Sequence, residues 1–600
     1  MDNTTYRNLT PDEILQLERQ GNYADDWSAL RVTDPFCPDC IRNSTFMGAV
    51  SLGSIERRRR TDGALTLPEG IYGSTLADVV LGNHPTVHNV RMMSRYTVGD
   101  DVLLFNIDEM TAAPEEPAWL EPMNENGGRR IMPFAGMTIG DAYLWARYRG
   151  RKTLMQRLEQ YTRTLLDSPE GRYGRLGDSC VVKNTKSLHN IIVRSSADDP
   201  SRIDSCIALR DGVVGYGCTL EDGVIAARFL LGEHVHLEFG LRLNDTVVGD
   251  NSTLARCEVG NSIIFPAHEQ HHNNSFLIAG LIMGQSNIAA GGTIGSNHNS
   301  RTADNELAAG RGFWPGLCCS FKHSSRFASY CLLAKADYPS ELDITLPFAL
   351  VNNNPAKDRL EVMPAYWWMY NMYAMNRNSK KFAKRDKRKV KAQNIEFDNL
   401  APDTAEEMLH GMELLRQWMA ASTDGTVYAD GMEKSKRRTV VLKAKEGLQA
   451  YEEMLVYYAM KYLTAATGNA LPSPAMAKGA RTKEWVNLGG QLVAKADMEQ
   501  LIADVENGTL GSWDDINRRL DALWQAYPAQ RDAHAYHVLC ALEGTDSLDD
   551  ARWQRLLDRY NAIQQYVDEQ IRLSRHKDEV NPYRNMTYWD ADEAAAVLLS

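Results

Sequence analysis

The sequence contains no uninterrupted apolar run of the ~18 residues that a membrane-spanning helix needs. Its first residues, Met1 to Asn8, are polar and lack the apolar segment of a secretory signal. Ten cysteines among 600 residues are too few for a disulfide scaffold. We therefore expect a cytoplasmic protein with no membrane partner.

Charge of either sign is not in large excess, because 66 Lys and Arg residues stand against 78 Asp and Glu residues, a formal net charge of −12. The 22 prolines and 43 glycines are ordinary for globular proteins, which argues against long disorder or a fibrous repeat. One hydrophobic core stops growing at roughly 250 to 300 residues. A chain of 600 residues therefore predicts two or more structural units.

A pair formed by an aliphatic residue and a glycine recurs at a fixed interval along the first half of the chain. Val214-Gly215, Leu231-Gly232 and Val248-Gly249 follow one another at steps of 17 residues, and the same step separates Leu81-Gly82 from Val98-Gly99. The short aliphatic stretches between these pairs show no helical periodicity. This pattern favours strands of two to four residues separated by turns.

A step of 17 or 18 residues is close to three units of six residues, which predicts a triangular coil with one short strand and one turn per unit. Stacked coils then form three parallel sheets around a column of aliphatic side chains. Gly, Asn or Asp is expected at the corners, where a positive φ is tolerated. The alternatives are a different β-solenoid and a sandwich with accidental periodicity.

These repeats resemble the left-handed parallel β-helix of the hexapeptide-repeat acyltransferases over about residues 36 to 350, with interruptions. The opening from Tyr6 to Trp27 also looks like an uncharacterised bacterial family of β-helix proteins. The left-handed winding is implied by the resemblance alone. The resemblance further implies acyl transfer from acyl-coenzyme A at a site between neighbouring subunits of a trimer.

Two helical regions interrupt and follow the repeats. Ile139 to Asp167 places apolar residues at helical spacing, whereas Glu109 to Asn126, rich in Pro, Glu and Ala, predicts a surface excursion. After about Asn354 the sequence changes to long helical patterns. The predicted fold is a β-solenoid plus α, divided into an N-terminal helical lead-in (1–35), a first β-helix segment (36–138), a helical insertion (139–172), a second β-helix segment (173–353) and a C-terminal helical domain (354–600).

The region from residue 271 to residue 299 is similar to the acetyltransferase half of the bifunctional glucosamine-1-phosphate acetyltransferase and uridyltransferase family. By this resemblance His272 matches the general base, Asn297 the substrate-orienting Asn and Arg242 a sugar-phosphate-binding Arg. Such a base takes a proton from the hydroxyl or amine that attacks the thioester. The predicted site is completed by His271 as a second candidate base and by Asn274, His298, Asn299 and Arg301 as substrate contacts. The alternative is a polar loop that bulges from the solenoid.

Two other motifs suggest metal or nucleic-acid chemistry. The segment from His268 to His272 has the His-Glu-x-x-His spacing of a zinc site, but Pro266 precedes it and no helical pattern surrounds it, so no metal is expected. Lys380 to Lys391 contains eight basic residues in twelve beside an aromatic run. This basic segment could face solvent, pair within the chain, hold coenzyme A phosphates or contact nucleic acid.

The sequence leads to two main hypotheses, beside a third in which a nucleic-acid-associated factor uses the basic segment from Lys380 to Lys391. The first is an acyltransferase-like protein that uses acyl-CoA as co-substrate and a sugar phosphate or nucleotide sugar as acceptor. Its partners would be this anionic sugar and further copies of the chain, a trimer by resemblance, and nucleic acid is not expected. The second is a non-catalytic β-helix scaffold or ligand-binding protein with a helical assembly domain.

Overall fold

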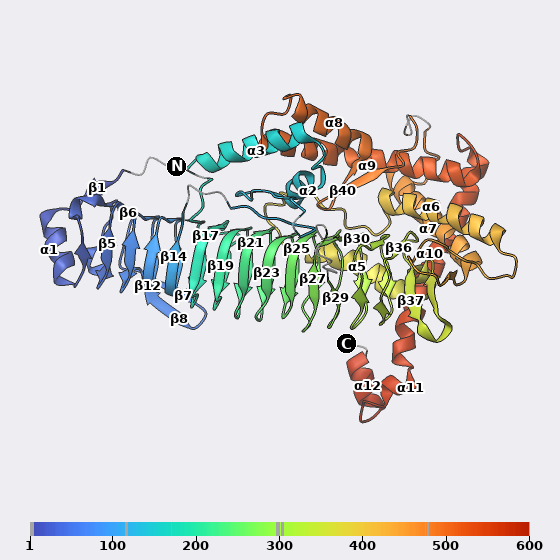
Figure 1. Cartoon of the computed structure of the whole chain (residues 1–600), viewed down its shortest axis with the longest axis horizontal. Helices are drawn as coiled ribbons and strands as arrows, with labels where there is room; N and C mark the ends of the chain where they lie inside the picture. The colour runs from blue at the N-terminus through green and yellow to red at the C-terminus, as the bar shows by residue number, and fades with distance from the viewer. Residues whose placement is uncertain are drawn as a thin grey trace.

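The computed structural model describes residues 5–113, 118–125, 127–169, 171–295, 301, 305–473, 476 and 479–598. A parallel β-solenoid of about 18 turns forms the long axis of the molecule, and helices cover one of its sides and its C-terminal end (Figure 1). The predicted fold class, a β-solenoid joined to helical segments, is confirmed. The left hand of the winding stays a prediction.

The first part of the solenoid begins with short strands and receives the hairpin of β7 (Arg59–Asp62) and β8 (Leu65–Pro68). Parallel pairing already starts before residue 36, because Tyr23 pairs with Thr45. The strands of this part are β2 (Tyr23–Ala24), β3 (Leu30–Val32), β4 (Ile41–Arg42), β5 (Thr45–Met47), β6 (Val50–Leu52), β9 (Gly70–Tyr72), β10 (Thr75–Ala77), β11 (Val80–Leu81), β12 (Thr86–Ser94), β13 (Thr97–Val98) and β14 (Leu103–Thr111), with β1 (Arg7–Asn8) antiparallel to β3.

The second part of the solenoid continues the same sheets after the helical insertion, since Leu103 pairs in parallel with Val181. Its strands are β15 (Arg175–Leu176), β16 (Val181–Lys183), β17 (Ser187–Val193), β18 (Arg202–Asp204), β19 (Ala208–Val214), β20 (Thr219–Glu221), β21 (Ile225–Leu231), β22 (His236–Glu238), β23 (Arg242–Val248), β24 (Thr253–Ala255), β25 (Glu258–Ile264), β26 (Glu269–Gln270), β27 (Phe276–Ile278), β28 (Gly280–Ile282), β29 (Thr293–Ile294), β30 (Leu307–Ala309), β31 (Trp314–Pro315), β32 (Ser320–Phe321), β33 (Arg326–Phe327), β34 (Leu332–Leu333), β35 (Asp337–Tyr338), β36 (Asp343–Ile344) and β37 (Leu350–Asn354).

The repeated glycines lie where successive coils approach most closely. A Cβ atom on Gly215 would come within 2.1 Å of the carbonyl oxygen of Gly232, and one on Gly249 would come within 2.5 Å of the nitrogen of Pro266. Any larger residue would push the coils apart. The step of 17 residues in the sequence is therefore the length of one coil.

The long strands bend at residues with positive φ, which form the corners of the coils. Asp211, Asp245 and Asn261 have φ values of 54°, 48° and 42° in one such column. Asn and Asp tolerate this left-handed region better than most residues. The corners at Phe239 and Arg256 also have positive φ, however, so the expectation of Gly, Asn or Asp at the corners is met only in part.

One sheet of the solenoid is buried on both faces. Val214, Leu231 and Val248 belong to the cluster inside the coils. Their neighbours Val213, Leu230 and Val247 point outward and pack under the helical segments. Strands that are covered on both sides read as continuous apolar runs, which explains the paired aliphatic residues before each glycine.

The helices belong to the insertion and to the C-terminal part, apart from one at the N-terminus. They are α1 (Pro11–Arg19), α2 (Ile139–Arg147), α3 (Lys152–Asp167), α4 (Tyr366–Tyr370), α5 (Met372–Arg385), α6 (Pro402–Ala421), α7 (Ala444–Thr467), α8 (Lys495–Glu506), α9 (Trp513–Glu543), α10 (Asp550–Glu579), α11 (Pro582–Asn585) and α12 (Ala591–Leu598). Within the described residues, none of these helices combines the length and apolar character of a bilayer-spanning segment.

The helical insertion and the C-terminal helices meet over the outer face of the solenoid. The hydrophobic cluster at this face joins α2 and α3 to α8 and the start of α9, and Figure 1 shows these helices along one side of the coils. The predicted surface excursion from Glu109 to Asn126 is wrong in its described part, because Leu120 and Met123 are fully buried in this cluster. Their apolar side chains fill the space between coils and helices.

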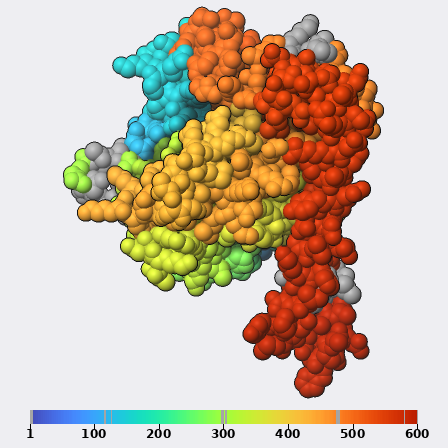
Figure 2. All heavy atoms as spheres, turned by 90° about the vertical axis from the view of Figure 1, so that its right-hand side faces the viewer, coloured from blue at the N-terminus to red at the C-terminus, as the bar shows by residue number. Residues whose placement is uncertain are grey.

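Short strands and an arm complete the molecule. The last coil ends in an antiparallel pair of β37 with β38 (Arg359–Met363), which is followed by β39 (Thr439–Val441) and by the hairpin of β40 (Trp485–Leu488) and β41 (Gln491–Ala494). α11 and α12 extend away from the body as an arm (Figure 2).

Candidate functional site

The histidine pair predicted from the sequence lies at a corner of the solenoid, between β26 and β27. Nδ1 of His271 is 3.2 Å from Oε2 of Glu269. A carboxylate at this position keeps the proton on Nδ1 and orients the ring, so that Nε2 is the proton acceptor. This is the arrangement that a histidine general base requires.

The basic helix α5 lies against the same carboxylate. Nζ of Lys381 is 3.7 Å and Nη1 of Arg385 is 3.3 Å from Oε1 of Glu269. Lys381 is largely buried, and burial lowers its pKa, whereas the Arg385 side chain is 58% exposed. One oxygen of Glu269 therefore faces the imidazole and the other faces two cations. We call the group formed by Arg256, Glu269, His271, Lys381 and Arg385 the cationic corner.

His272 and Asn274 are exposed beside the cationic corner. The rings of His271 and His272 are 4.4 Å apart, but the carboxylate contact belongs to His271. Asn274 has a φ of 60° at the turn, so its left-handed backbone accounts for an Asn at this position. The geometry favours His271 over His272 as the base.

Arg256 adds a third cation from the preceding coil. Its Nη1 is 3.4 Å from the carbonyl oxygen of His271, and its guanidinium lies 4.2 Å from the centre of the Phe239 ring. Stacking on an aromatic face fixes the direction of an arginine side chain. The cationic corner thus holds its positive charges in place around one imidazole.

The remaining predicted residues are not brought together with His271. Arg242 is exposed at the start of β23 and pairs in register with Glu258, which in turn pairs with Phe276. Asn297, His298 and Asn299 lie outside the described residues. Arg301 is described and exposed. Across the described residues, no hydrogen bond or ion pair joins Arg242 to either histidine.

The zinc-like motif from His268 to His272 does not form a metal site in the described structure. His268 is fully buried, with Nδ1 2.8 Å from Oγ of Ser286 and Nε2 3.2 Å from Oε1 of Gln270, and burial lowers its pKa to about 4. It is a hydrogen-bonded core residue. Among the residues that the structure describes, no group of three or more His, Cys, Asp or Glu side chains is placed to hold a metal ion.

The basic segment from Lys380 to Lys391 has two different roles. Its first part supplies Lys381 and Arg385 to the cationic corner. Its second part pairs within the chain, because the buried Arg388 lies 2.6 Å from Asp250. The sequence could not show this division, since Glu269 and Arg385 are 116 positions apart. The only sequence signal for the contact with Glu269 was the high density of positive charge in this segment.

The comparisons with known proteins identify relatives along the whole chain. A family model described as "Domain of unknown function (DUF4954)" matches residues 6–419, and one described as "Domain of unknown function (DUF6819)" matches residues 472–584. A protein of Treponema pallidum (strain Nichols), described as "Uncharacterized protein", is 42% identical over 651 residues, which cover 99% of this chain and 90% of the relative. None of these descriptions names an activity. The chain belongs to the DUF4954 family, whose model spans the solenoid and α6.

Proposed function

We propose that the protein is an acyltransferase that moves an acyl group from acyl-coenzyme A to a sugar phosphate or nucleotide sugar, with His271 as the general base. The observation that carries the proposal is the 3.2 Å contact between Nδ1 of His271 and Glu269, a carboxylate that Lys381 and Arg385 also contact. The histidine identified from the sequence is thus accompanied by an orienting carboxylate that the sequence comparison had not assigned.

The chemistry follows from the orientation of His271. Nε2 takes the proton from the acceptor hydroxyl or amine while the acceptor atom bonds to the thioester carbonyl carbon. The tetrahedral intermediate then collapses, the carbon–sulfur bond breaks, and the imidazolium returns its proton to the departing thiolate. Glu269 stabilises the imidazolium between these two steps, as a buried carboxylate does for other catalytic histidines.

The cations of the corner suit the phosphate groups of both substrates. Guanidinium groups bind phosphate oxygens with two parallel hydrogen bonds, and an ammonium group acts as a point charge. Arg385 is exposed enough to turn from Glu269 toward a ligand. Arg242, Asn274 and Arg301 remain predicted contacts for the sugar phosphate.

The proposal includes self-association, and the helices of the chain limit which face of the solenoid a second copy can contact. The outer face over Val213, Leu230 and Val247 is already packed under helices of the same chain. A neighbouring subunit would therefore approach a different face of the solenoid. We place the contact with a second copy beside the cationic corner, where His272 and Asn274 are exposed.

The test is release of coenzyme A thiol from acetyl-coenzyme A in the presence of a panel of hexosamine phosphates and nucleotide sugars. His271→Gln should lower the rate by about 10²- to 10⁴-fold, the range typical of losing a general base. His272→Gln, which alters the neighbouring exposed ring, is the matched control and should retain most activity. The proposal fails if no acceptor supports release, or if both variants behave alike.

A second candidate function is a non-catalytic, ligand-binding scaffold. The observation in its favour is that helices of the chain cover one face of the solenoid along several coils. Binding of coenzyme A without turnover, at equal affinity in the parent and in His271→Gln, would select this function.

A further inference from the structure

A cleft lies between the last coils of the solenoid and the helices that cover them. This cleft has a volume of about 490 Å³, and residues from α2, the coils, α6 and β40 line it. Its size is within the range of small-molecule sites. The cationic corner contributes no residue to its lining. We call it the Arg311 cleft.

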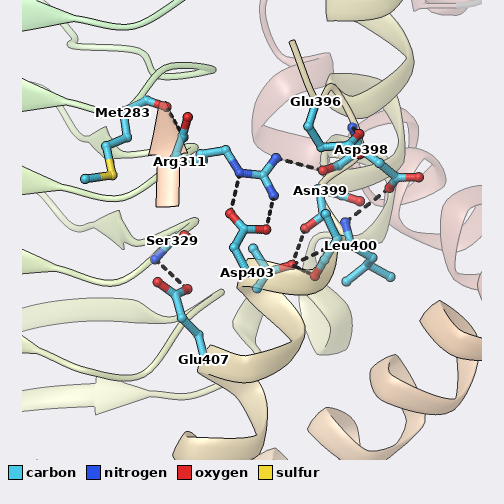
Figure 3. A network of polar contacts seen from close by, with 12 residues as sticks. Met283, Arg311, Ser329, Glu396, Asp398, Asn399, Leu400, Asp403 and Glu407 are labelled. Carbon is cyan, nitrogen blue, oxygen red and sulfur yellow. Dashed lines mark hydrogen bonds and ion pairs between the residues drawn. The ribbon is translucent and has the colours of Figure 1, made fainter. Parts of the chain in front are cut away.

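The floor of the cleft is a buried ion pair. Nε and Nη2 of Arg311 donate to the two carboxylate oxygens of Asp403 at 2.9 and 2.7 Å, and Nη1 donates to the carbonyl oxygen of Asp398 at 2.8 Å (Figure 3). Arg311 is only 2% exposed. Its charge is neutralised by Asp403, so it forms a rigid polar floor rather than a free anion site.

Glu407 lies one helical turn beyond Asp403 on α6 and lines the same cleft. Its carboxylate accepts a hydrogen bond of 3.0 Å from the backbone N–H of Ser329 (Figure 3). Burial, helped by the charge of Asp403, raises its pKa to about 7. A carboxyl group of this kind is present in both the ionised and the protonated form near neutral pH, so it can accept or donate a hydrogen bond.

Aromatic rings form part of the walls. Tyr143 and Tyr148 come from α2 and its C-terminal end, and Trp485 comes from β40. Contacts outside the cleft fix two of these rings: Tyr143 packs edge-on against Phe265 with 5.4 Å between centroids, and the Trp485 indole N–H donates to the carbonyl oxygen of Thr482 at 3.1 Å. The walls are therefore preorganised.

The charges of the lining balance. Arg147, Arg311 and Lys495 are opposed by Asp403, Glu407 and Glu499. A phosphate ligand would meet as much negative as positive charge here, unlike at the cationic corner. The lining instead offers many donors and acceptors next to aromatic surface.

We propose that the Arg311 cleft binds an uncharged, polyhydroxylated ring, that is, a neutral saccharide unit. The C–H face of such a ring carries partial positive charge and packs against the electron-rich face of Trp485 or Tyr148. Its hydroxyl groups donate to Glu407 and accept from Arg147 and Lys495. This site is independent of the acyl transfer proposed for His271, because no residue is shared between them.

The test uses the full-length protein on an array of immobilised neutral mono- and oligosaccharides. The parent should be retained by at least one neutral saccharide. Trp485→Ala and the nearly isosteric Glu407→Gln should each weaken that retention tenfold or more. Trp589→Ala, at a tryptophan that is 92% exposed on the C-terminal arm, is the matched control and should leave retention unchanged.

Two results on the saccharide array would overturn the proposal. One is the absence of retention by any neutral saccharide. The other is retention that neither Trp485→Ala nor Glu407→Gln changes. Thermal unfolding of each variant shows whether it is folded, and Glu407→Gln keeps the test valid if the tryptophan variant is not. Competition by pyrophosphate through the same residues would likewise contradict a neutral ligand.

Discussion

The cationic corner and the Arg311 cleft use the same solenoid in opposite ways. At the corner, a half-exposed imidazole and its carboxylate lie beside cations from α5 and the preceding coil. At the cleft, α6 supplies Asp403 to the buried Arg311 of the coils and Glu407 to the backbone N–H of Ser329. In both sites, the coils hold their side chains at the regular spacing of the repeat. The helix that packs against them decides whether the site is positively charged or neutral.

The difference in burial also separates the two sites energetically. The Glu269 carboxylate of the corner has partly exposed partners, from 19% for Lys381 to 58% for Arg385, so its ion pairs contribute less to stability than a fully desolvated pair. The ion pair of the cleft is desolvated, and removing one member leaves an unpaired buried charge. Substitutions at the corner should therefore change ligand binding, whereas substitutions at the floor of the cleft should first change the stability of the fold.

The largest expected effect is on stability at the floor of the cleft. Arg311→Ala should lower the free energy of unfolding by about 3 to 5 kcal/mol, because it leaves the Asp403 carboxylate without its partner. The matched control is Arg326→Ala, whose partner Asp343 sits in an ion pair with side chains 68% and 44% exposed. The control should cost less than about 1 kcal/mol. Urea unfolding measures both, and equal small losses would contradict a buried pair.

The next effect is the part of the pH dependence of stability that Glu407 contributes. Glu407 has a raised pKa of about 7 in the folded protein, against 4.5 as its ordinary value. The folded state therefore holds the proton more tightly, and stability falls as the pH rises from about 4.5 to about 7, by up to about 3 kcal/mol. Glu407→Gln should reduce the slope by the Glu407 share, whereas Glu233 and Asp141, whose pKa values burial raises to about 7 and about 6, keep theirs. Urea unfolding at pH 5 and pH 7.5 is the measurement. A variant with an unchanged slope would exclude Glu407 as its source.

The smallest effect is expected at the cationic corner. Lys381→Ala and Arg385→Ala should each weaken coenzyme A binding by about tenfold or less at low salt, since each removes one partly exposed charge. The loss should shrink at 1 M salt, where the Debye length is about 3 Å. Lys434→Ala, at a lysine whose side chain is 80% exposed, is the control. Calorimetric titration at two salt concentrations measures the three variants, and salt-independent losses would contradict an electrostatic contact.

The solenoid could be predicted from the sequence because its determinants are local and repeat. Glycines such as Gly215 and Gly232 are needed where neighbouring coils nearly touch. The aliphatic residue before each glycine belongs to the hydrophobic core inside the coils. The helical insertion could be predicted for the same reason, from apolar spacing alone. The corners were predicted less well, because Phe239 and Arg256 take a conformation that their residue types do not suggest.

The candidate sites could be predicted only in part, because they depend on contacts between distant segments. The choice between His271 and His272 as the base depends on which ring faces Glu269. The two histidines are adjacent in the sequence, so the sequence alone does not decide between them. Arg311 and Asp403 are 92 positions apart in segments with no motif, so the cleft left no signal in the sequence. Packing of helices on coils, rather than the repeat itself, creates both sites.

The most direct test of two chemically distinct sites is a crossed binding experiment. Coenzyme A and the neutral saccharide selected by the array are each titrated into the parent, the double variant Lys381→Ala/Arg385→Ala, and Trp485→Ala. The account predicts that the double variant loses coenzyme A affinity and keeps the saccharide, and that Trp485→Ala does the reverse. Loss of the same ligand in both variants, or of neither ligand in either variant, would contradict it.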